Sequence, residues 1–368
     1  MKRFLALSFT AVVTIGIFSC KTAQQKTNAV ASTPKGLKDY YAGYFPIGVA
    51  VSPMALKTDE AGLILQEFNS LTAENAMKMG PIHPRENEYN WRGGDSIAAF
   101  ARRHNMKMRG HCLVWHNQTP SWLFTHPNGD TVNRDVLLQR MKEHITTVVQ
   151  RYKDVIYAWD VVNEVISDNP KEFYRPSPFL RIIGEDYIAK AFEFAHAADP
   201  KALLFYNDYN EINPVKRGKI IRMIRELQAK GVPIHGIGLQ AHWAITEPSA
   251  SQLDATLREF SEVGLPLHIT ELDISVYPKE HNARDRKPSD YDTTFTPERA
   301  AAQAEKYALC FEYFRKYRQH ISSVTFWNVS DRYSWLDNFP VRGRKDHPLL
   351  FDRNLQRKPA YDRVVNFK

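Results

Sequence analysis

Short apolar runs alternate with segments of helical spacing along most of this chain. In residues 134–153 apolar side chains recur every three or four positions, so they would line one face of a helix, and residues 214–230 repeat the pattern. Eight apolar runs after Lys35 are each followed by a segment of this helical kind. These runs, which we expect to be strands, are residues 45–51, 70–74, 107–115, 156–164, 202–208, 236–242, 267–273 and 323–330.

The number of alternations indicates the fold class. Eight strand–helix units within residues 36–368 predict one α/β domain with the fold of a (β/α)8 TIM barrel. An open doubly wound sheet usually has fewer strands and often carries a glycine-rich nucleotide loop after the first strand, which this sequence lacks.

The sequence also marks where two of the helices begin. Ser249 with Gln252 forms a capping-box pattern, and Thr296 before Pro297 supplies a cap and a first-turn proline.

Polar and aromatic residues gather where the expected strands end. Glu164 closes the fourth apolar run, and Glu271 lies near the end of the seventh. Side chains at the carboxyl ends of barrel strands share one face, which the long irregular stretches 277–295 and 331–350 would also border. Two carboxylates on one rim are what acid-catalysed cleavage of a glycosidic bond requires. The strand-end clusters are residues 72–78, 110–116, 159–164, 207–210, 240–243, 270–273 and 327–331.

Two of these clusters carry specific motifs, Trp-Asp-Val-Val-Asn-Glu at residues 159–164 and Ile-Thr-Glu-Leu-Asp at residues 269–273. From about Tyr44 to its C-terminus, the chain resembles glycoside hydrolase family 10, the retaining endo-1,4-β-xylanases, because all the clusters occur in that family's order and approximate spacing. The resemblance implies hydrolysis of internal β-1,4-xylosidic bonds in xylan or xylo-oligosaccharides by double displacement, with no cofactor and no metal.

The resemblance also implies roles for five residues of the catalytic centre. Glu164 would be the general acid and base, and Glu271 the nucleophile. Asn163 would reach the sugar 2-hydroxyl, while His242 and Asp273 would orient Glu271. Retention requires the two carboxyl groups to lie about 5–5.5 Å apart. It also requires pKa values that are pushed apart, so we expect a raised pKa for Glu164 and an ionised Glu271.

The family pattern further implies a set of substrate-binding residues and shows one departure. Asn328 follows Trp327 at a position where the family commonly has glycine, and a side chain there would alter how the pocket treats sugar substituents. The implied binding residues are Glu74, Asn75 and Lys78 for the sugar next outward on the glycone side, His111, Trp115, Gln240, Trp327 and Trp335 around the sugar being cleaved, and Tyr209 and Asn210 on the aglycone side.

The first residues have the pattern of an export signal. Lys2 and Arg3 precede a mostly apolar stretch, too short for a confident membrane span, that ends in Ile-Phe-Ser-Cys at residues 17–20. This ending resembles the bacterial lipoprotein cleavage box, in which the cysteine, here Cys20, becomes the lipidated N-terminus. We expect an exported lipoprotein on the outer membrane, on its periplasmic or cell-surface side, or, after ordinary cleavage near Ser19, a secreted protein. The expected parts are a signal peptide at 1–19, a lipid-anchored linker at 20–35 and the catalytic domain at 36–368.

Charge and cysteine usage narrow the function classes. The formal net charge is +8, but the basic residues are scattered and no nucleic-acid-binding motif accompanies them, so we expect a solvated exterior and no nucleic acid partner. Cys112 and Cys310 lack metal-ligand spacing, and we expect two buried free thiols rather than a disulfide. On a strand, His111 and His116 would face opposite sides, which disfavours a metal site.

Two alternative functions remain open at this point. The same catalytic residues would serve a β-1,4-glucanase acting on cellulose or mixed-linkage glucan. A protein of a different class, a non-catalytic xylan-binding surface lipoprotein, could use an inactive hydrolase scaffold. The presence of both Glu164 and Glu271, together with Asn163 and the pair His242 and Asp273, argues against the second alternative, because a binding protein has no use for reactive carboxyl groups.

Overall fold

The computed structural model describes residues 1, 8, 11, 34–279 and 283–367. The chain divides after Pro34, and the fold described below belongs to the unit Lys35–Lys368. Most of the expected signal peptide and linker, including Cys20, lies outside the described residues. In the described part of the chain, no helix combines the length and apolar character needed to cross a membrane.

The strands of this unit are parallel and close into a barrel, as predicted. They are β1 (Ile47–Val51), β2 (Ser70–Ala73), β3 (Lys107–Trp115), β4 (Ile156–Asn163), β5 (Leu203–Asp208), β6 (Gly236–Leu239), β7 (His242–Ala244), β8 (Leu267–Ser275) and β9 (Ile321–Phe326). At the seam, β1 pairs with both β2 and β9, and Gly48 lies opposite Ser70 and Thr325. A Cβ on Gly48 would come within 2.8 Å of the Thr325 hydroxyl oxygen, so the seam depends on glycine here.

The sixth and eighth predicted strands differ from the observed ones. The run predicted as one strand, 236–242, is divided between β6 and β7, because Ala241 has a φ of +61° and turns the chain. After this turn β7 pairs with β8, and His242 lies opposite Asp273. The last strand was expected to reach residue 330 but ends at Phe326, and Asn328 follows with a φ of +116°.

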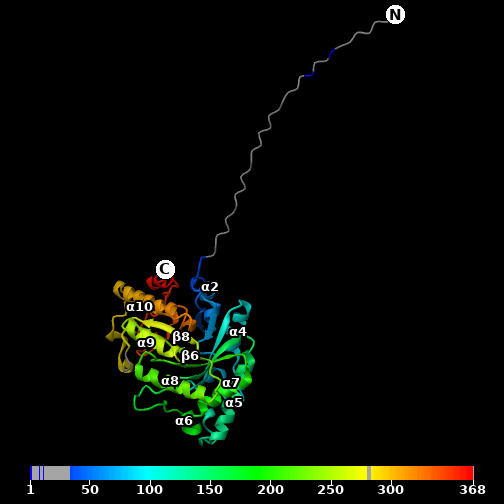
Figure 1. Cartoon of the computed structure of the whole chain (residues 1–368), viewed down its shortest axis with the longest axis vertical. Coiled ribbons are helices and arrows are strands. Elements are labelled where there is room, and N and C mark those ends of the chain that lie inside the picture. Colours follow the sequence, from blue (N-terminus) through cyan, green and yellow to red (C-terminus); the bar gives the residue numbers. More distant parts are fainter. Residues whose placement is uncertain (2–7, 9–10, 12–33, 280–282, 368) are drawn as a thin grey trace. The chain divides into compact units, whose positions relative to one another are not determined.

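Helices surround the barrel, and their starts agree with the sequence signals. Ser249 and Gln252 form the predicted capping box, and Thr296 accepts a hydrogen bond from the Arg299 backbone N–H. Figure 1 shows β6 and β8 side by side within the ring of helices. The larger helices are α2 (Glu60–Glu67), α4 (Arg92–Arg103), α5 (Arg134–Tyr152), α7 (Tyr187–Ala198), α8 (Pro214–Ala229), α9 (Ala250–Ser261), α10 (Pro297–Lys316) and α11 (Pro359–Val365), and the shorter ones are α1 (Leu37–Tyr40), α3 (Met79–Ile82) and α6 (Pro178–Ile183).

The core follows the predicted helix faces and strand interiors. Leu137, Met141 and Ile145 of α5 are fully buried against the barrel, as their spacing predicted. Cys112 and Cys310 are both buried and free, which confirms the prediction for these two thiols.

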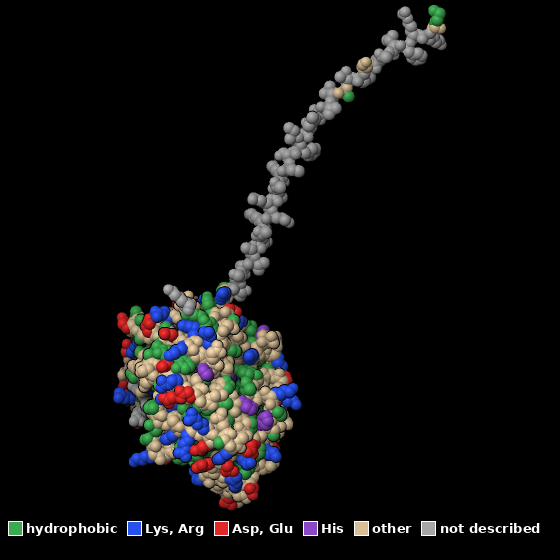
Figure 2. Space-filling model, viewed as in Figure 1, with side chains coloured by type: hydrophobic (Ala, Val, Ile, Leu, Met, Phe, Trp, Pro, Cys, Tyr) green, Lys and Arg blue, Asp and Glu red, His purple; other side chains and the backbone are tan. Residues whose placement is uncertain are grey.

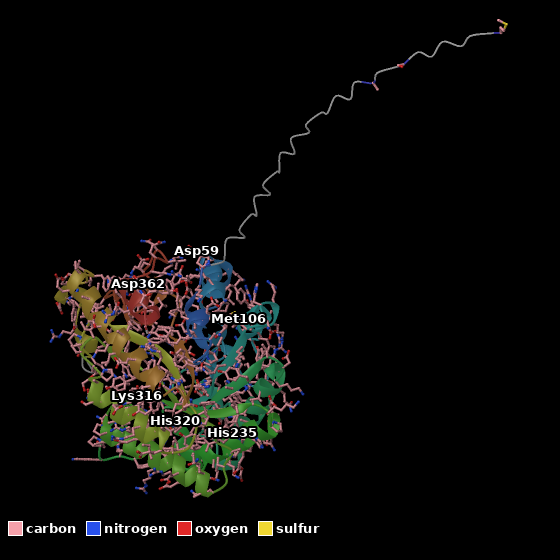
Figure 3. All side chains as sticks on the ribbon, turned by 45° about the horizontal axis from the view of Figure 1, so that its top comes forward. Asp59, Met106, His235, Lys316, His320 and Asp362 are labelled. Carbon is pink, nitrogen blue, oxygen red and sulfur yellow. The ribbon has the colours of Figure 1, made fainter. Side chains whose placement is uncertain are left out.

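The surface carries both charge signs. Figure 2 shows Lys and Arg side chains interspersed with Asp and Glu over the visible face of the folded unit, as expected for a solvated exterior. Met106, His235 and His320, labelled in Figure 3, directly precede β3, β6 and β9. These residues therefore mark the amino-terminal end of the barrel, opposite the rim on which the predicted site residues lie.

The long stretch after β9 is held in place by a buried ion pair. Lys358, at the start of α11, donates from Nζ to Asp331 Oδ2 (2.9 Å) and to the carbonyl oxygens of His347 and Leu349 (2.7 Å each). Asp331 also accepts a hydrogen bond from the Leu349 backbone N–H (2.8 Å). One lysine thus ties both ends of the 331–350 loop to the C-terminal helix.

Replacing this lysine should destabilise the fold in a pH-dependent way. Burial raises the pKa of Asp331 to about 6 even though Lys358 lowers it. In Lys358→Met the carboxylate loses its cation, so we expect the free energy of unfolding at pH 8 to fall by about 3 kcal/mol. The loss of stability relative to the wild type should be smaller at pH 5. At that pH Asp331 of the folded variant binds a proton, whereas in the unfolded chain Asp331 binds it only at lower pH. Urea unfolding at both pH values measures this.

A matched variant on the same loop serves as the control. Lys345 pairs with Asp337 (Nζ to Oδ2, 2.8 Å), but the lysine is more than half exposed. Lys345→Met should therefore cost less than about 1 kcal/mol at either pH. Equal losses in the two variants would contradict the role given to Lys358.

Candidate active site

Glu164 lies immediately after β4, at the point where the strand leaves the barrel. Its backbone has a φ of +58°, its side chain is 9% exposed, and its two carboxyl oxygens accept hydrogen bonds from Trp115 Nε1 (2.8 Å) and Gln240 Nε2 (2.9 Å). Burial raises the pKa of Glu164, and the charges of Asp208 and Glu271 add to this, while the two hydrogen bonds act in the opposite direction. Glu164 therefore keeps its proton to a higher pH than a solvent-exposed glutamate does.

Glu271 projects from β8 and has the opposite environment. It is 4% exposed, Asn207 Nδ2 donates to its Oε1 (2.7 Å), and His242 Nε2 lies 3.2 Å from its Oε2. Burial alone would raise the pKa of Glu271, but His111, His242 and Arg109 outweigh burial and lower that pKa to about 2. Glu271 is therefore a carboxylate over almost the whole pH range of a folded protein.

Side-chain amides connect the two carboxyl groups. Gln240 donates from Nε2 to Glu164 and makes a longer contact with Asn163 Oδ1 (3.5 Å). Asn207 donates from Nδ2 to the same Asn163 oxygen (2.9 Å) and to Glu271 (2.7 Å). The two glutamates therefore belong to one hydrogen-bonded site at the rim of the barrel, as the sequence predicted. Glu164, with its raised pKa, and the carboxylate of Glu271 face this common site.

Asn207 is a central residue to which the sequence analysis gave no role. It lies in the strand-end cluster 207–210, which is the signal that could have found it. Its Oδ1 accepts a hydrogen bond from Thr270 Oγ1 (2.7 Å), so its Nδ2 must face Glu271. The neighbouring β6 makes room for the amide, because a Cβ on Gly238 would come within 2.3 Å of Asn207 Oδ1. Only the pairing of β5, β6 and β8 reveals this arrangement.

A second chain of contacts runs outward from Glu271. His242 Nδ1 lies 3.0 Å from Asp273 Oδ2, and Trp335 Nε1 donates to the same oxygen (2.8 Å). The Trp335 ring also lies over His242, with centroids 4.9 Å apart. Burial would lower the pKa of His242, but Asp273 and Glu271 raise it to about 10. His242 is therefore an imidazolium placed between two carboxylates.

Beneath the rim, the barrel interior holds a further charged group. Arg109, which is fully buried on β3, pairs with Asp160 and donates to the Thr270 carbonyl oxygen (2.8 Å). His111 Nδ1 lies 2.8 Å from Asp160 Oδ2. His111, predicted to lie at the sugar being cleaved, packs its ring against that of Trp327 (5.2 Å between centroids). Arg109 and Asp160 had no predicted role.

The predicted glycone residues also meet at this rim. Lys78 Nζ donates to Asn75 Oδ1 (2.9 Å) and lies 4.9 Å from the Trp115 ring centroid and 5.9 Å from that of Trp327. Burial raises the pKa of Glu74, whereas Lys78 lowers it. Lys78 thus lies between Asn75 and the two tryptophans, and the charges of Lys78 and Glu271 both act on Glu74.

The predicted aglycone residues are joined to Glu164 through a group that the sequence analysis did not identify. Asp168 accepts hydrogen bonds from Asn210 Nδ2 (3.1 Å), from the Tyr209 hydroxyl and from Arg175 Nη2 (2.9 Å). Arg175 also donates to the Tyr209 hydroxyl oxygen (2.7 Å) and to the Glu164 carbonyl oxygen (3.0 Å). No motif marks Asp168 or Arg175, because both lie in the irregular segment between β4 and α6.

The structure therefore brings all the predicted site residues within the described part of the chain to one rim. Among those described residues, no group of three or more His, Cys, Asp or Glu side chains is arranged to hold a metal ion. The arrangement offers a proton donor, a carboxylate nucleophile, an imidazolium that stabilises this carboxylate, and aromatic walls. The first two of these are the groups that a retaining glycosidase requires.

Comparison with known proteins agrees with this geometry. A family model described as glycosyl hydrolase family 10 matches residues 36–367. Endo-1,4-beta-xylanase B of Paenibacillus barcinonensis is 49% identical over 325 residues, which are 88% of this chain and 96% of that protein. An endo-1,4-beta-xylanase of Geobacillus stearothermophilus is 46% identical over 339 residues, which are 92% of this chain and all of that protein.

Solved structures give the same result. The crystal structure of xylanase XynB from Paenibacillus barcinonensis, complexed with a conduramine derivative, has a TM-score of 0.86 at 48% identity and covers 91% of this chain and 99% of its own. An endo-1,4-beta-xylanase from Caldicellulosiruptor owensensis has a TM-score of 0.85 at 45% identity, with 91% of this chain and all of that chain covered. With its barrel, its paired glutamates and a family model over nearly its whole length, this chain belongs to glycosyl hydrolase family 10.

Proposed function

We propose that this protein is an endo-1,4-β-xylanase that cleaves internal bonds of xylan with retention of anomeric configuration. The observation that carries the proposal is the pair of glutamates in one hydrogen-bonded site, one with a raised pKa and the other with a pKa of about 2. The two relatives named above are endo-1,4-beta-xylanases, and this chain aligns with nearly the full length of each. Family, fold and site chemistry thus point to the same reaction.

The first half-reaction breaks the glycosidic bond. Glu164 transfers its proton to the leaving oxygen, while Glu271 attacks the anomeric carbon and forms a covalent glycosyl–enzyme. For direct attack we expect the two carboxyl groups to lie about 5–5.5 Å apart. In the second half-reaction, Glu164 removes a proton from water, the hydroxyl oxygen bonds to the anomeric carbon, and Glu271 leaves as a carboxylate. Two inversions give net retention.

The surrounding residues support both steps. His242, held as a cation by Asp273, keeps Glu271 ionised before attack and stabilises it again as the leaving group. Asn163 would contact the sugar 2-hydroxyl beside the nucleophile. Asn207 donates hydrogen bonds to both Asn163 and Glu271 and so holds these two side chains in position. The proposed sugar-binding residues are Glu74, Asn75 and Lys78 outward on the glycone side, His111, Trp115, Gln240, Trp327 and Trp335 around the cleaved sugar, and Tyr209 and Asn210 on the aglycone side.

The N-terminal residues support a proposal on location. The chain would be made with a signal peptide at 1–19 and exported, and Cys20 would carry the lipid, with residues 20–35 as a linker to the catalytic domain at 36–368. The support is the sequence alone: Lys2 and Arg3, the apolar stretch after them and the Ile-Phe-Ser-Cys ending at 17–20. The lipid carried by Cys20 would hold the enzyme at a membrane surface.

Product analysis with the two glutamate variants tests the reaction. Wild-type enzyme should shorten glucuronoxylan from within, release the β-anomer first in proton NMR, and act faster on xylan than on carboxymethyl cellulose. Glu271→Ala should lose activity on every substrate. Glu164→Ala should lose xylan cleavage by about 10²–10⁴-fold but keep the glycosylation step on aryl xylobiosides whose leaving group needs no proton.

Four results would contradict parts of the proposed function. Faster hydrolysis of cellulose would indicate a β-1,4-glucanase, and xylan binding without turnover would indicate a binding protein. An α-anomer as first product would exclude retention. Equal losses on both substrate types in Glu164→Ala would remove Glu164 from the acid role.

The positive charges of His111, His242 and Arg109 around Glu271 set the acidic limit of activity, and that of His242 can be removed by substitution. Activity requires Glu271 to be ionised, and burial would raise the pKa of Glu271 without its cationic neighbours. In His242→Asn we therefore expect the acidic limb of the kcat/KM profile to move to higher pH by about 1 unit or more. The alkaline limb, which follows deprotonation of Glu164, should stay in place. Parallel movement of both limbs, or of neither, would contradict this assignment.

Lipid attachment at Cys20 can be measured directly on protein made in a bacterial host with a lipoprotein pathway. Mass spectrometry of the mature N-terminus should find an acylated cysteine, and Cys20→Ala should shift the enzyme from the membrane fraction to the soluble one. A mature wild-type protein with an unmodified N-terminus would support ordinary secretion instead.

A further inference from the structure

Asn328 is the residue of the rim whose backbone and side chain the reaction scheme leaves unexplained. It lies two residues after the end of β9, with a φ of +116°, a region that favours glycine over every other residue. It is only 6% exposed, so its side chain is inside the site rather than in solvent. Strained backbone is kept where the surrounding structure or the function requires it. The side chain is therefore the feature to explain.

The neighbours of Asn328 place it at the glycone end of the site. Trp327, directly before it, contacts the rings of His111 and His242 and lies 5.9 Å from Lys78 Nζ. The Asn328 amide faces the carboxyl group of Glu74 and, after burial and Lys78, is the next largest influence on the pKa of that group, which it lowers. Asn328 and Glu74 thus lie beside each other, just after the ends of β9 and β2, the two strands that flank β1.

The amide nitrogen of Asn328 has an unused hydrogen-bonding capacity. Nδ2 is buried, and its interaction with the Glu74 carboxyl group is too long or too bent to count as a full hydrogen bond, so at least one of its two N–H groups is free. An unsatisfied buried donor is costly, and native proteins retain few of them. Beside it, Glu74 supplies acceptor oxygens. A donor next to an acceptor matches a sugar hydroxyl group, whose oxygen accepts a hydrogen bond while its hydrogen is donated.

We propose that Asn328 is a specificity-determining residue for the glycone side, where its Nδ2 donates to the sugar unit that Glu74 also binds. The ligand is the β-1,4-linked xylosyl unit one place outward from the sugar being cleaved. This inference rests on the proposed function and deepens it, because it assigns one further polar contact to that unit. The side chain acts by adding a directed donor where glycine would leave only space.

The test compares substrates that differ in this one sugar. Asn328→Gly removes the amide and suits the observed backbone, so the variant should fold with an unfolding midpoint no lower than that of the wild type. With the same aryl leaving group, kcat/KM on the β-xylobioside should fall about 5- to 10-fold, as expected for loss of one hydrogen bond. On the β-xyloside, which lacks the outer sugar, kcat/KM should change by less than about twofold.

A second variant preserves the shape of the side chain. Asn328→Asp replaces the donor by a carboxylate beside Glu74, so its loss on the xylobioside at pH 7 should exceed that of Asn328→Gly. Part of this loss should be recovered near pH 5, where a carboxyl group crowded by Glu74 takes up a proton and can donate again. The xyloside should again be little affected, because the outer position is empty in that complex.

Three outcomes would overturn the inference. Equal losses on the xylobioside and the xyloside would mean that Asn328 acts through Trp327 or the backbone. Unchanged kcat/KM on both substrates would mean that the amide makes no contact with sugar. Wild-type enzyme that is inactive on the xylobioside would refute the proposed function itself, which the first two outcomes leave intact.

Discussion

The chemistry of this protein depends on keeping two neighbouring carboxyl groups in different protonation states. Both Glu164 and Glu271 are almost fully buried, and burial alone would raise the pKa of each. What separates them is the charge of their partners. Glu164 has the neutral donors Trp115 and Gln240, whereas Glu271 has the imidazolium of His242 close to it and the guanidinium of Arg109 below. The uncharged partners offset only part of the effect of burial on the pKa of Glu164, whereas the charged partners outweigh it at Glu271.

The barrel supplies this difference by delivering each partner from a different strand. Asn207 from β5, Thr270 from β8 and the gap at Gly238 in β6 together fix the orientation of one amide. The rim itself uses unusual backbone. Glu164, Asn210, Ala241 and Asn328 all follow barrel strands with positive φ, so the chain turns sharply where it leaves those strands. Such conformations persist because closed parallel pairing below them holds the strands rigidly.

Much of this arrangement could be predicted from the sequence. The parts that could not be predicted lack a local sequence signal. Helical and strand periodicity reports which face of an element is buried, so the barrel, the caps at Ser249 and Thr296 and the faces of α5 could be predicted. The division of the sixth strand at Ala241 was missed, because an alanine carries no local signal for a left-handed backbone. Asp168 and Arg175 were missed because they lie in a segment without periodicity or motif.

The sequence by itself determined the order of elements and the identity of the reactive carboxyl groups, since both are written in local spacing and in residues that interrupt apolar runs. Only the tertiary structure decided what those carboxyl groups experience. Asn207 lies 64 residues from Glu271, and Arg109 lies 161 residues from the Thr270 carbonyl that it binds. The protonation state of a buried group depends on charges within a few ångströms in space, whatever their distance along the chain, and that proximity exists only after the barrel has closed.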